Sequence, residues 1–221
     1  MIFFAKAILF DMDGVLMDST PSVERVWRTW AAQHGLDPER VVALAHGRRS
    51  IETIRAVAPE LDAEKENILV AQMEIDDKEG VTALPGAAEL LAHLPPDRFA
   101  IVTSATRPLA VARLGYASIP APRHIITADD VIHGKPAPEP FLKGAALLGF
   151  APEDCLVFED SPAGVASARS AGMKAIALQT TYPADQLQAA DAIIGNLADV
   201  KSSLHDERIT LELAPFPIAK S

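Results

Sequence analysis

The chain of 221 residues has little of several features that mark other classes of protein. It has one cysteine, Cys155, so no disulfide can form within the chain, and we expect a cytoplasmic location. The longest stretch without a charged residue, 175–184, is ten residues long and too short to cross a bilayer. No polybasic run is present and the net charge is −10, so nucleic acids and anionic membranes are unfavourable partners.

The apolar start of the chain does not indicate a signal peptide. MIFFAKAILFDMDG is interrupted by two aspartates and lacks a small-residue cleavage site, so we interpret it as a buried strand. Hydrophobic residues make up 49% and charged residues 23%, as in ordinary globular proteins. No repeat is present, and the length suits one domain with a modest insertion.

Short apolar runs alternate with helical segments over most of the chain. Near-continuous apolar strands are typical of a parallel sheet covered by helices on both faces. The predicted strands are 2–10, 99–104, 124–127, 155–159 and 174–178. This alternation predicts an α/β fold with a Rossmann-like, doubly wound parallel sheet. The alternating segment 208–213 is predicted as an edge strand, and 214–221 as a loose tail.

Residues 17–83 interrupt this pattern, because they contain no convincing strand. Four helices are predicted there, with start signals at Thr20-Pro21, Asp37-Pro38, Ser50 and Asp62, the last two as N-caps; the second helix is expected to end at Gly47. A helical insert after the first strand predicts a cap over the strand ends. The chain then divides into a core of 1–16 and 84–213 and a four-helix cap of 17–83, with hinges at 15–19 and 80–86.

Polar residues follow the predicted strands at the edge where ligands of open α/β sheets bind. Asp11 and Asp13 come directly after the first strand, and carboxylates this close favour a cation such as Mg²⁺ between them. An Asp-Gly turn without a ligand is the alternative for this motif alone. Ser104 follows the second strand where a helix begins, a place that suits phosphate or serves as an ordinary N-cap.

Two further segments complete the pattern. Lys135 lies on a loop bounded by glycine and proline, and Glu159 and Asp160 end a third strand. Ionised Asp11 and Asp160 with a phosphate dianion carry about four negative charges, against about three positive charges from Mg²⁺ and Lys135, with helix dipoles supplying part of the rest. Together these residues predict a phosphoryl-transfer site, which works by positioning and charge neutralisation.

In this order and spacing, FDMDG, VTSAT, GKPAP and VFEDSPAG resemble the four motifs of haloacid dehalogenase-like phosphohydrolases with a helical cap. AHGRRS, EGVTALPGA and TADDVIHGKPAPEPFLKG resemble the sugar-phosphate and hexitol-phosphate phosphatase branch, which is similar to glycerol-phosphate and 2-deoxyglucose-6-phosphate phosphatases. The resemblance covers nearly the whole chain. It implies a Mg²⁺-dependent phosphatase that acts on small sugar or sugar-alcohol phosphates.

The resemblance also implies a role for each motif residue. Asp11 is the expected nucleophile that forms an aspartyl-phosphate, and Asp13 the general acid and then base. Ser104 is expected to bind the phosphate and Lys135 to steady Asp11 and the phosphoryl group. The implied Mg²⁺ ligands are Asp11, the main-chain oxygen of Asp13 and Asp160, with Glu159 acting through water.

Cap and phosphate-loop residues are expected to bind the substrate: Glu24, His46, Arg49, Ser104, Ala105 and Thr106. Either Arg48 or Arg49 suits a sugar hydroxyl or the phosphate rim, and a solvated arginine face is the alternative. The β-phosphoglucomutases carry a histidine where this chain has Val23 and a lysine where it has His46, so hydrolysis is favoured over the mutase reaction.

Three other interpretations stay open beside the sugar-phosphate phosphatase. The first is a β-phosphoglucomutase-like mutase, and the second is a glycerol-phosphate phosphatase. The third is a non-catalytic member that binds metabolites or partners, although no motif residue is lost. We expect the partner to be a small phosphomonoester, because a closing helical cap leaves no room for a folded protein, and the protein to be a monomer.

Overall fold

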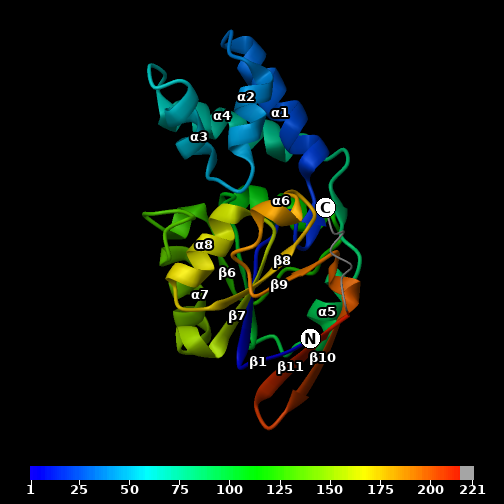
Figure 1. Cartoon of the computed structure of the whole chain (residues 1–221). Coiled ribbons are helices and arrows are strands. Elements are labelled where there is room, and N and C mark those ends of the chain that lie inside the picture. The colour runs from blue at the N-terminus through cyan, green and yellow to red at the C-terminus, as the bar shows by residue number, and fades with distance from the viewer. Residues whose placement is uncertain (215–221) are drawn as a thin grey trace.

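The computed structural model describes residues 1–214, which form a large parallel sheet, two small sheets and eight α-helices (Figure 1). The strands are β1 (Ile2–Ala5), β2 (Ala7–Phe10), β3 (Met17–Asp18), β4 (Thr82–Ala83), β5 (Phe99–Val102), β6 (Ile125–Ile126), β7 (Cys155–Glu159), β8 (Lys174–Leu178), β9 (Ala192–Ile194), β10 (Val200–His205) and β11 (Arg208–Leu213). The α-helices are α1 (Thr20–Gln33), α2 (Pro38–Ala45), α3 (Ser50–Val57), α4 (Ala63–Asp76), α5 (Ala87–His93), α6 (Arg107–Tyr116), α7 (Glu139–Leu148) and α8 (Pro162–Ser170). No helix within these residues combines the length and apolar character that a membrane crossing requires.

The main sheet has the strand order β6-β5-β2-β7-β8-β9, and every pair is parallel. Alternate residues of its strands enter two separate cores. Ile8 and Phe10 face one core, shared with α5 and α6, and Leu9 faces the other, shared with α7 and α8. Burial on both faces explains the continuous apolar runs, and the predicted Rossmann-like doubly wound sheet is confirmed.

A second sheet corrects two predictions. The single strand expected over 2–10 is divided at Lys6, whose N–H and ammonium both bind Asp154, at 2.7 and 2.9 Å. The chain before this point, β1, pairs antiparallel with β11 in a sheet of order β1-β11-β10. The expected edge strand 208–213 is therefore the central strand of this sheet. Of the expected tail, 215–221 lies outside the described residues.

Helices α1–α4 form a separate helical unit above the carboxyl ends of the main strands (Figure 1). Its own core includes Trp27, Trp30, Val41, Ile54 and Val70, and all five side chains are buried. Amphipathic spacing on α1 places both tryptophans in that core, where their rings pack edge to face.

The junction and the ends of these helices differ in detail from the prediction. A short antiparallel ribbon, β3–β4, stands where 17–83 was expected to contain no strand. Helix α2 ends at Ala45 rather than at Gly47. Ser50 is the first residue of α3 and not its N-cap, because Arg49 occupies the cap position; the predicted cap by Asp62 is confirmed by its bond to the Lys65 N–H.

Candidate active site

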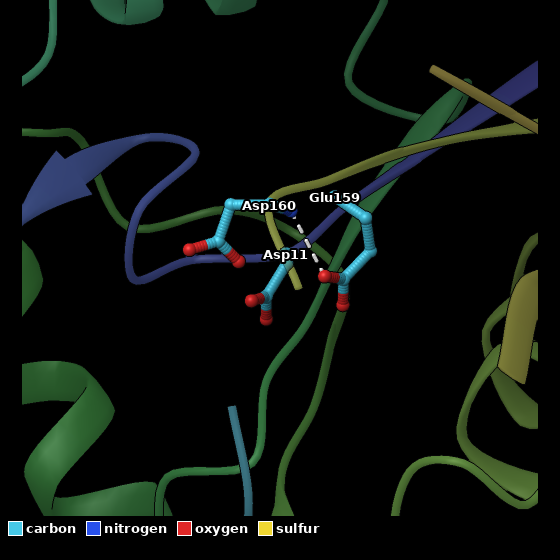
Figure 2. Close-up of side chains that lie close together, drawn as sticks. All are labelled: Asp11, Glu159 and Asp160. Atoms are coloured by element: carbon cyan, nitrogen blue, oxygen red, sulfur yellow. Dashed lines mark hydrogen bonds between the residues drawn. The ribbon is translucent and has the colours of Figure 1, made fainter. Parts of the chain in front are cut away.

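Asp11 and Asp160 meet at the carboxyl ends of the neighbouring strands β2 and β7. Phe10 pairs with Phe158, and the Asp11 N–H donates to the Phe158 carbonyl at 2.9 Å, so this register places the next residues of both strands side by side. Carboxylate oxygens of Asp11, Glu159 and Asp160 lie within 4.8 Å of one another (Figure 2). All three side chains are buried.

Lys135 contacts two carboxylates of this cluster, those of Asp11 and Glu159. The Lys135 ammonium lies 2.8 Å from Oδ1 of Asp11 and 2.5 Å from Oε1 of Glu159. Oε2 of Glu159 accepts the N–H groups of Asp160 and Ser161, at 2.9 and 3.0 Å. Because protein groups bind both of its oxygens, Glu159 anchors Lys135 and the turn from β7 into α8.

The carboxylates carry more negative charge than Lys135 offsets. Burial raises the pKa of Asp11 to about 7, although Lys135 opposes this rise. Burial and the charges of Glu159 and Asp11 raise the pKa of Asp160 as well. Burial works against the charge of Lys135, but Asp11 and Glu159 outweigh it and raise the pKa of Lys135. A divalent cation with hard oxygen ligands fits this cluster.

Gly14 keeps the approach to Asp160 open. Its φ of +76° lies in the left-handed region, and a β carbon there would stand 1.9 Å from Oδ2 of Asp160. Only glycine therefore lets the loop after Asp13 cross so close to the carboxylate.

A cavity of about 70 Å³ lies between the α/β core and the helical unit, directly at this cluster. The core side includes Asp11, Asp13, Thr103, Ser104, Ala105, Arg113 and Asp160. The helical unit contributes Trp27, Ala45, His46, Gly47, Arg48 and Glu74, among others. Ser104 and Ala105 stand at the N-terminal end of α6, where backbone N–H groups and the helix dipole favour an anion.

A family model described as haloacid dehalogenase-like hydrolase matches residues 5–172. The chain belongs to this family. It is 44% identical to hexitol phosphatase A of Escherichia coli (strain K12), over 88% of this chain and 93% of that protein. It is 35% identical to glycerol-1-phosphate phosphohydrolase 2 of Saccharomyces cerevisiae, over 89% and 84%. The crystal structure of a hydrolase from Pseudomonas syringae superimposes with a TM-score of 0.78, at 27% identity, over 87% of this chain and 94% of that one.

In this haloacid dehalogenase-like hydrolase, most residues expected in the site do lie together. Asp11, Asp13, His46, Ser104, Ala105 and Asp160 line the cavity, and Lys135 and Glu159 lie beneath them. Burial lowers the pKa of His46, opposed by the charges of Glu24 and Asp13. Thr106 does not line the cavity and is the N-cap of α6 without a side-chain cap bond.

Besides Thr106, two more expected substrate-binding residues lie outside the cavity. Arg49 pairs with Glu52 and donates to the carbonyls of Val131 and Ile132, so it joins the helical unit to the core outside the cavity. Arg49 is the N-cap residue of α3 and faces the core, whereas Arg48 lines the cavity. Glu24 pairs with Arg28 one turn along α1 and does not line the cavity.

Sequence reasoning missed two charged residues at the site, Glu74 and Arg113. Both are buried, line the cavity and form an ion pair with each other. A signal for Arg113 was present, because it stands on the apolar face of its helix between Leu109, Ala110 and Leu114. A charged residue at such a position needs a buried partner.

Proposed function

We propose that this hydrolase is a Mg²⁺-dependent phosphatase of small sugar or sugar-alcohol phosphates. One observation carries the proposal: Asp11 and Asp13 line the same cavity, and Lys135 lies 2.8 Å from the Asp11 carboxylate. This arrangement supplies a nucleophile, a proton carrier and a fixed positive charge within one small volume. The similarity to a hexitol phosphatase supports the substrate class.

Asp11 and Asp160 are the proposed side-chain ligands of Mg²⁺, together with the main-chain oxygen of Asp13. The raised pKa values of both carboxyls support a cation there. Mg²⁺ would neutralise charge on the phosphoryl group as it is transferred. Glu159 is not proposed as a direct ligand of Mg²⁺, because Lys135 and backbone N–H groups of the turn into α8 bind its two oxygens.

The reaction runs in two steps on Asp11. Its carboxylate attacks phosphorus, an aspartyl-phosphate forms, and the bond from phosphorus to the substrate oxygen breaks as Asp13 gives that oxygen a proton. Asp13 then takes a proton from water, which attacks phosphorus and releases inorganic phosphate from Asp11. Ser104 and the start of α6 hold the phosphate oxygens, and Lys135 stabilises the charge that develops.

The helical unit is the proposed cap, with 17–83 as the cap and 1–16 and 84–213 as the core. Trp27, His46, Arg48 and Glu74 line the cavity from this side and face the leaving group. A cavity of about 70 Å³ suits a small phosphomonoester, and a longer polyol enters only when the cap opens. The single cysteine supports a cytoplasmic location as part of the proposal.

Glycerol phosphate is the second candidate substrate, supported by the similarity to a glycerol-1-phosphate phosphohydrolase. Val23 lines the cavity with a side chain that cannot hydrogen-bond or transfer protons, which weighs against the mutase reaction.

The test is phosphate release from a panel of hexose, hexitol, pentose, glycerol and nucleotide monophosphates, with Mg²⁺ and with EDTA. Asp11→Asn and Asp13→Ala run beside the unchanged protein. Release that is concentrated on sugar or polyol phosphates, needs Mg²⁺ and is lost in both variants supports the proposal. No release from any substrate contradicts it, and isomerisation of glucose 1-phosphate without release would establish the mutase instead.

A further inference from the structure

A buried ion pair joins the helical unit to the core directly beside Asp13. Glu74 on α4 and Arg113 on α6 lie 3.2 Å apart, and their side chains are 4% and 5% exposed. The other arm of the same guanidinium lies 3.0 Å from Oδ1 of Asp13. Arg113 therefore bridges two carboxylates, one from each side of the cavity.

This bridge fixes one oxygen of Asp13 and leaves the other open. Oδ1 of Asp13 forms an ion pair with Arg113 at 3.0 Å and accepts a hydrogen bond from the Ser19 hydroxyl at 2.6 Å. Within residues 1–214, no hydrogen bond involves Oδ2, and Asp13 lines the cavity. A carboxylate held at one oxygen has the other available, in a defined direction, for proton transfer.

Structural support alone is a weak reason to bury this pair. Burying two charges is expensive, and apolar side chains of similar size often stabilise a protein as well or better. Arg113 even leaves its Nε atom, which is buried, without a hydrogen-bond partner in the described part of the chain. The guanidinium contacts two carboxylates through its terminal nitrogens, while its third nitrogen, Nε, makes no hydrogen bond within residues 1–214.

We propose that Arg113 is a positioning residue for Asp13, and that Glu74 holds Arg113 in place only when the helical unit lies against the core. Closing the cap would then complete the proton-transfer group as well as cover the substrate. This inference rests on the proposed function, because it concerns the residue proposed as general acid and base.

A plain tether between α4 and α6 is the alternative, and the structure offers a matched control for it. The Tyr116 hydroxyl donates to the Ile75 carbonyl at 2.6 Å, one turn along α6 from Arg113 and next to Glu74 on α4. Tyr116→Phe removes a contact between the same two helices without touching Asp13 or the cavity.

The experiment compares this control with the neutral double variant Arg113→Met/Glu74→Gln, which leaves no unpaired buried charge. First-turnover rates are measured on the best alkyl phosphate of the panel and on p-nitrophenyl phosphate, whose leaving group departs without a proton. We expect the double variant to lose roughly 10²-fold or more on the alkyl phosphate and less than about tenfold on the aryl phosphate. Inhibition by inorganic phosphate should change less than about threefold, because Ser104 and Lys135 are untouched.

Rescue provides a second readout that works on any substrate. Arg113→Lys/Glu74→Gln returns one positive charge to Asp13 without restoring the bridge, and should recover about tenfold or more of the lost rate. Equal losses on both substrates, no rescue, or an effect of Tyr116→Phe as large as that of the double variant would overturn the inference. If the unchanged protein releases no phosphate at all, the proposed function fails instead.

Discussion

Gly164 stands so close to Glu159 that no side chain fits between them. A β carbon at Gly164 would lie 1.8 Å from Oε1 of Glu159, less than any non-bonded contact allows. Gly164 lies in the first turn of α8, where its N–H donates to the N-cap Ser161 at 3.0 Å. The start of α8 and the Lys135–Glu159 ion pair therefore both require a residue without a β carbon at Gly164.

Gly164→Ala is expected to damage both the site and the fold. The added methyl pushes Glu159 away from Lys135, which then no longer steadies Asp11. We expect phosphate release to fall by about 10²-fold or more and the free energy of unfolding to fall by about 1–3 kcal/mol. Phosphate release and urea unfolding measure the two effects.

The control for this substitution is Gly115→Ala on α6. Nothing lies within 4 Å of a β carbon there. Alanine should keep activity unchanged and stabilise the helix by up to about 1 kcal/mol. Full activity in Gly164→Ala would show that the Glu159 carboxylate has room to move.

The metal-free protein should lose stability as the pH rises from about 4 to about 7. The pKa of Asp11 is about 7 in the fold and 3.8 at its ordinary value, so the folded state binds more protons between these limits. The free energy of unfolding then falls with rising pH across this interval. The raised pKa of Asp160 acts in the same direction. Thermal unfolding in EDTA at several pH values measures the slope.

Asp11→Asn isolates the contribution of Asp11 to this slope. The variant removes the buried charge, so its metal-free Tm at about pH 8 should exceed that of the unchanged protein by roughly 5 °C. Mg²⁺ should stabilise the unchanged protein more than the variant at that pH. An identical pH slope in both proteins would mean that Asp11 is not the titrating group.

Substitutions of Asp160 and of Glu159 should differ in their effect on the Mg²⁺ concentration that the enzyme requires. Asp160→Asn is expected to raise the Mg²⁺ concentration for half-maximal activity by about 10–100-fold, with a small effect on folding. Glu159→Gln instead leaves Lys135 with a weaker partner and is expected to destabilise the fold by about 3 kcal/mol. Magnesium titrations and unfolding curves of both variants decide this, and a reversal of the two effects would assign Glu159 as the ligand.

Arg48 and Arg49 should also differ, although they are neighbours in sequence. Arg48 lines the cavity, so Arg48→Ala should raise KM by about tenfold with a smaller change in kcat. Arg49 binds core carbonyls, so Arg49→Ala should lower the Tm and leave KM nearly unchanged. A KM effect confined to Arg49→Ala would return that residue to the substrate site.

The main sheet could be predicted because its strands are buried on both faces, which makes them visible as apolar runs. The break at Lys6 could not, because IFFAKAILF stays apolar on both sides of a lysine whose partner, Asp154, is distant in sequence. Ile2 and Phe4 are apolar although they are exposed. The continuous apolar run therefore did not reveal that β1 belongs to another sheet. The central place of β11 depends on pairing with β1 and β10, which a local pattern does not contain.

The same distinction applies to the site. Residues at strand ends, such as Asp11 and Asp160, could be predicted because parallel strands bring their carboxyl ends to one edge. Glu74 and Arg113 lie inside helices of different units, and only the packing of α4 over α6 makes them partners. Arg49 was expected in the cavity but lies outside it. The exact start of α3 decides which of the two adjacent arginines faces the cavity, and the sequence pattern does not fix that start.

The pairing of β1 with β11 has a consequence for how the chain is made. β1 leaves the ribosome before every other described strand, and its partner β11 follows all of them. The small sheet therefore closes last, after the residues of the parallel sheet have been synthesised. Until residues 209–211 emerge, the buried residues Phe3 and Ala5 lack their cross-strand partners Leu211 and Ile209. In a growing chain, β1 is an open strand edge available for chaperones or for wrong pairing.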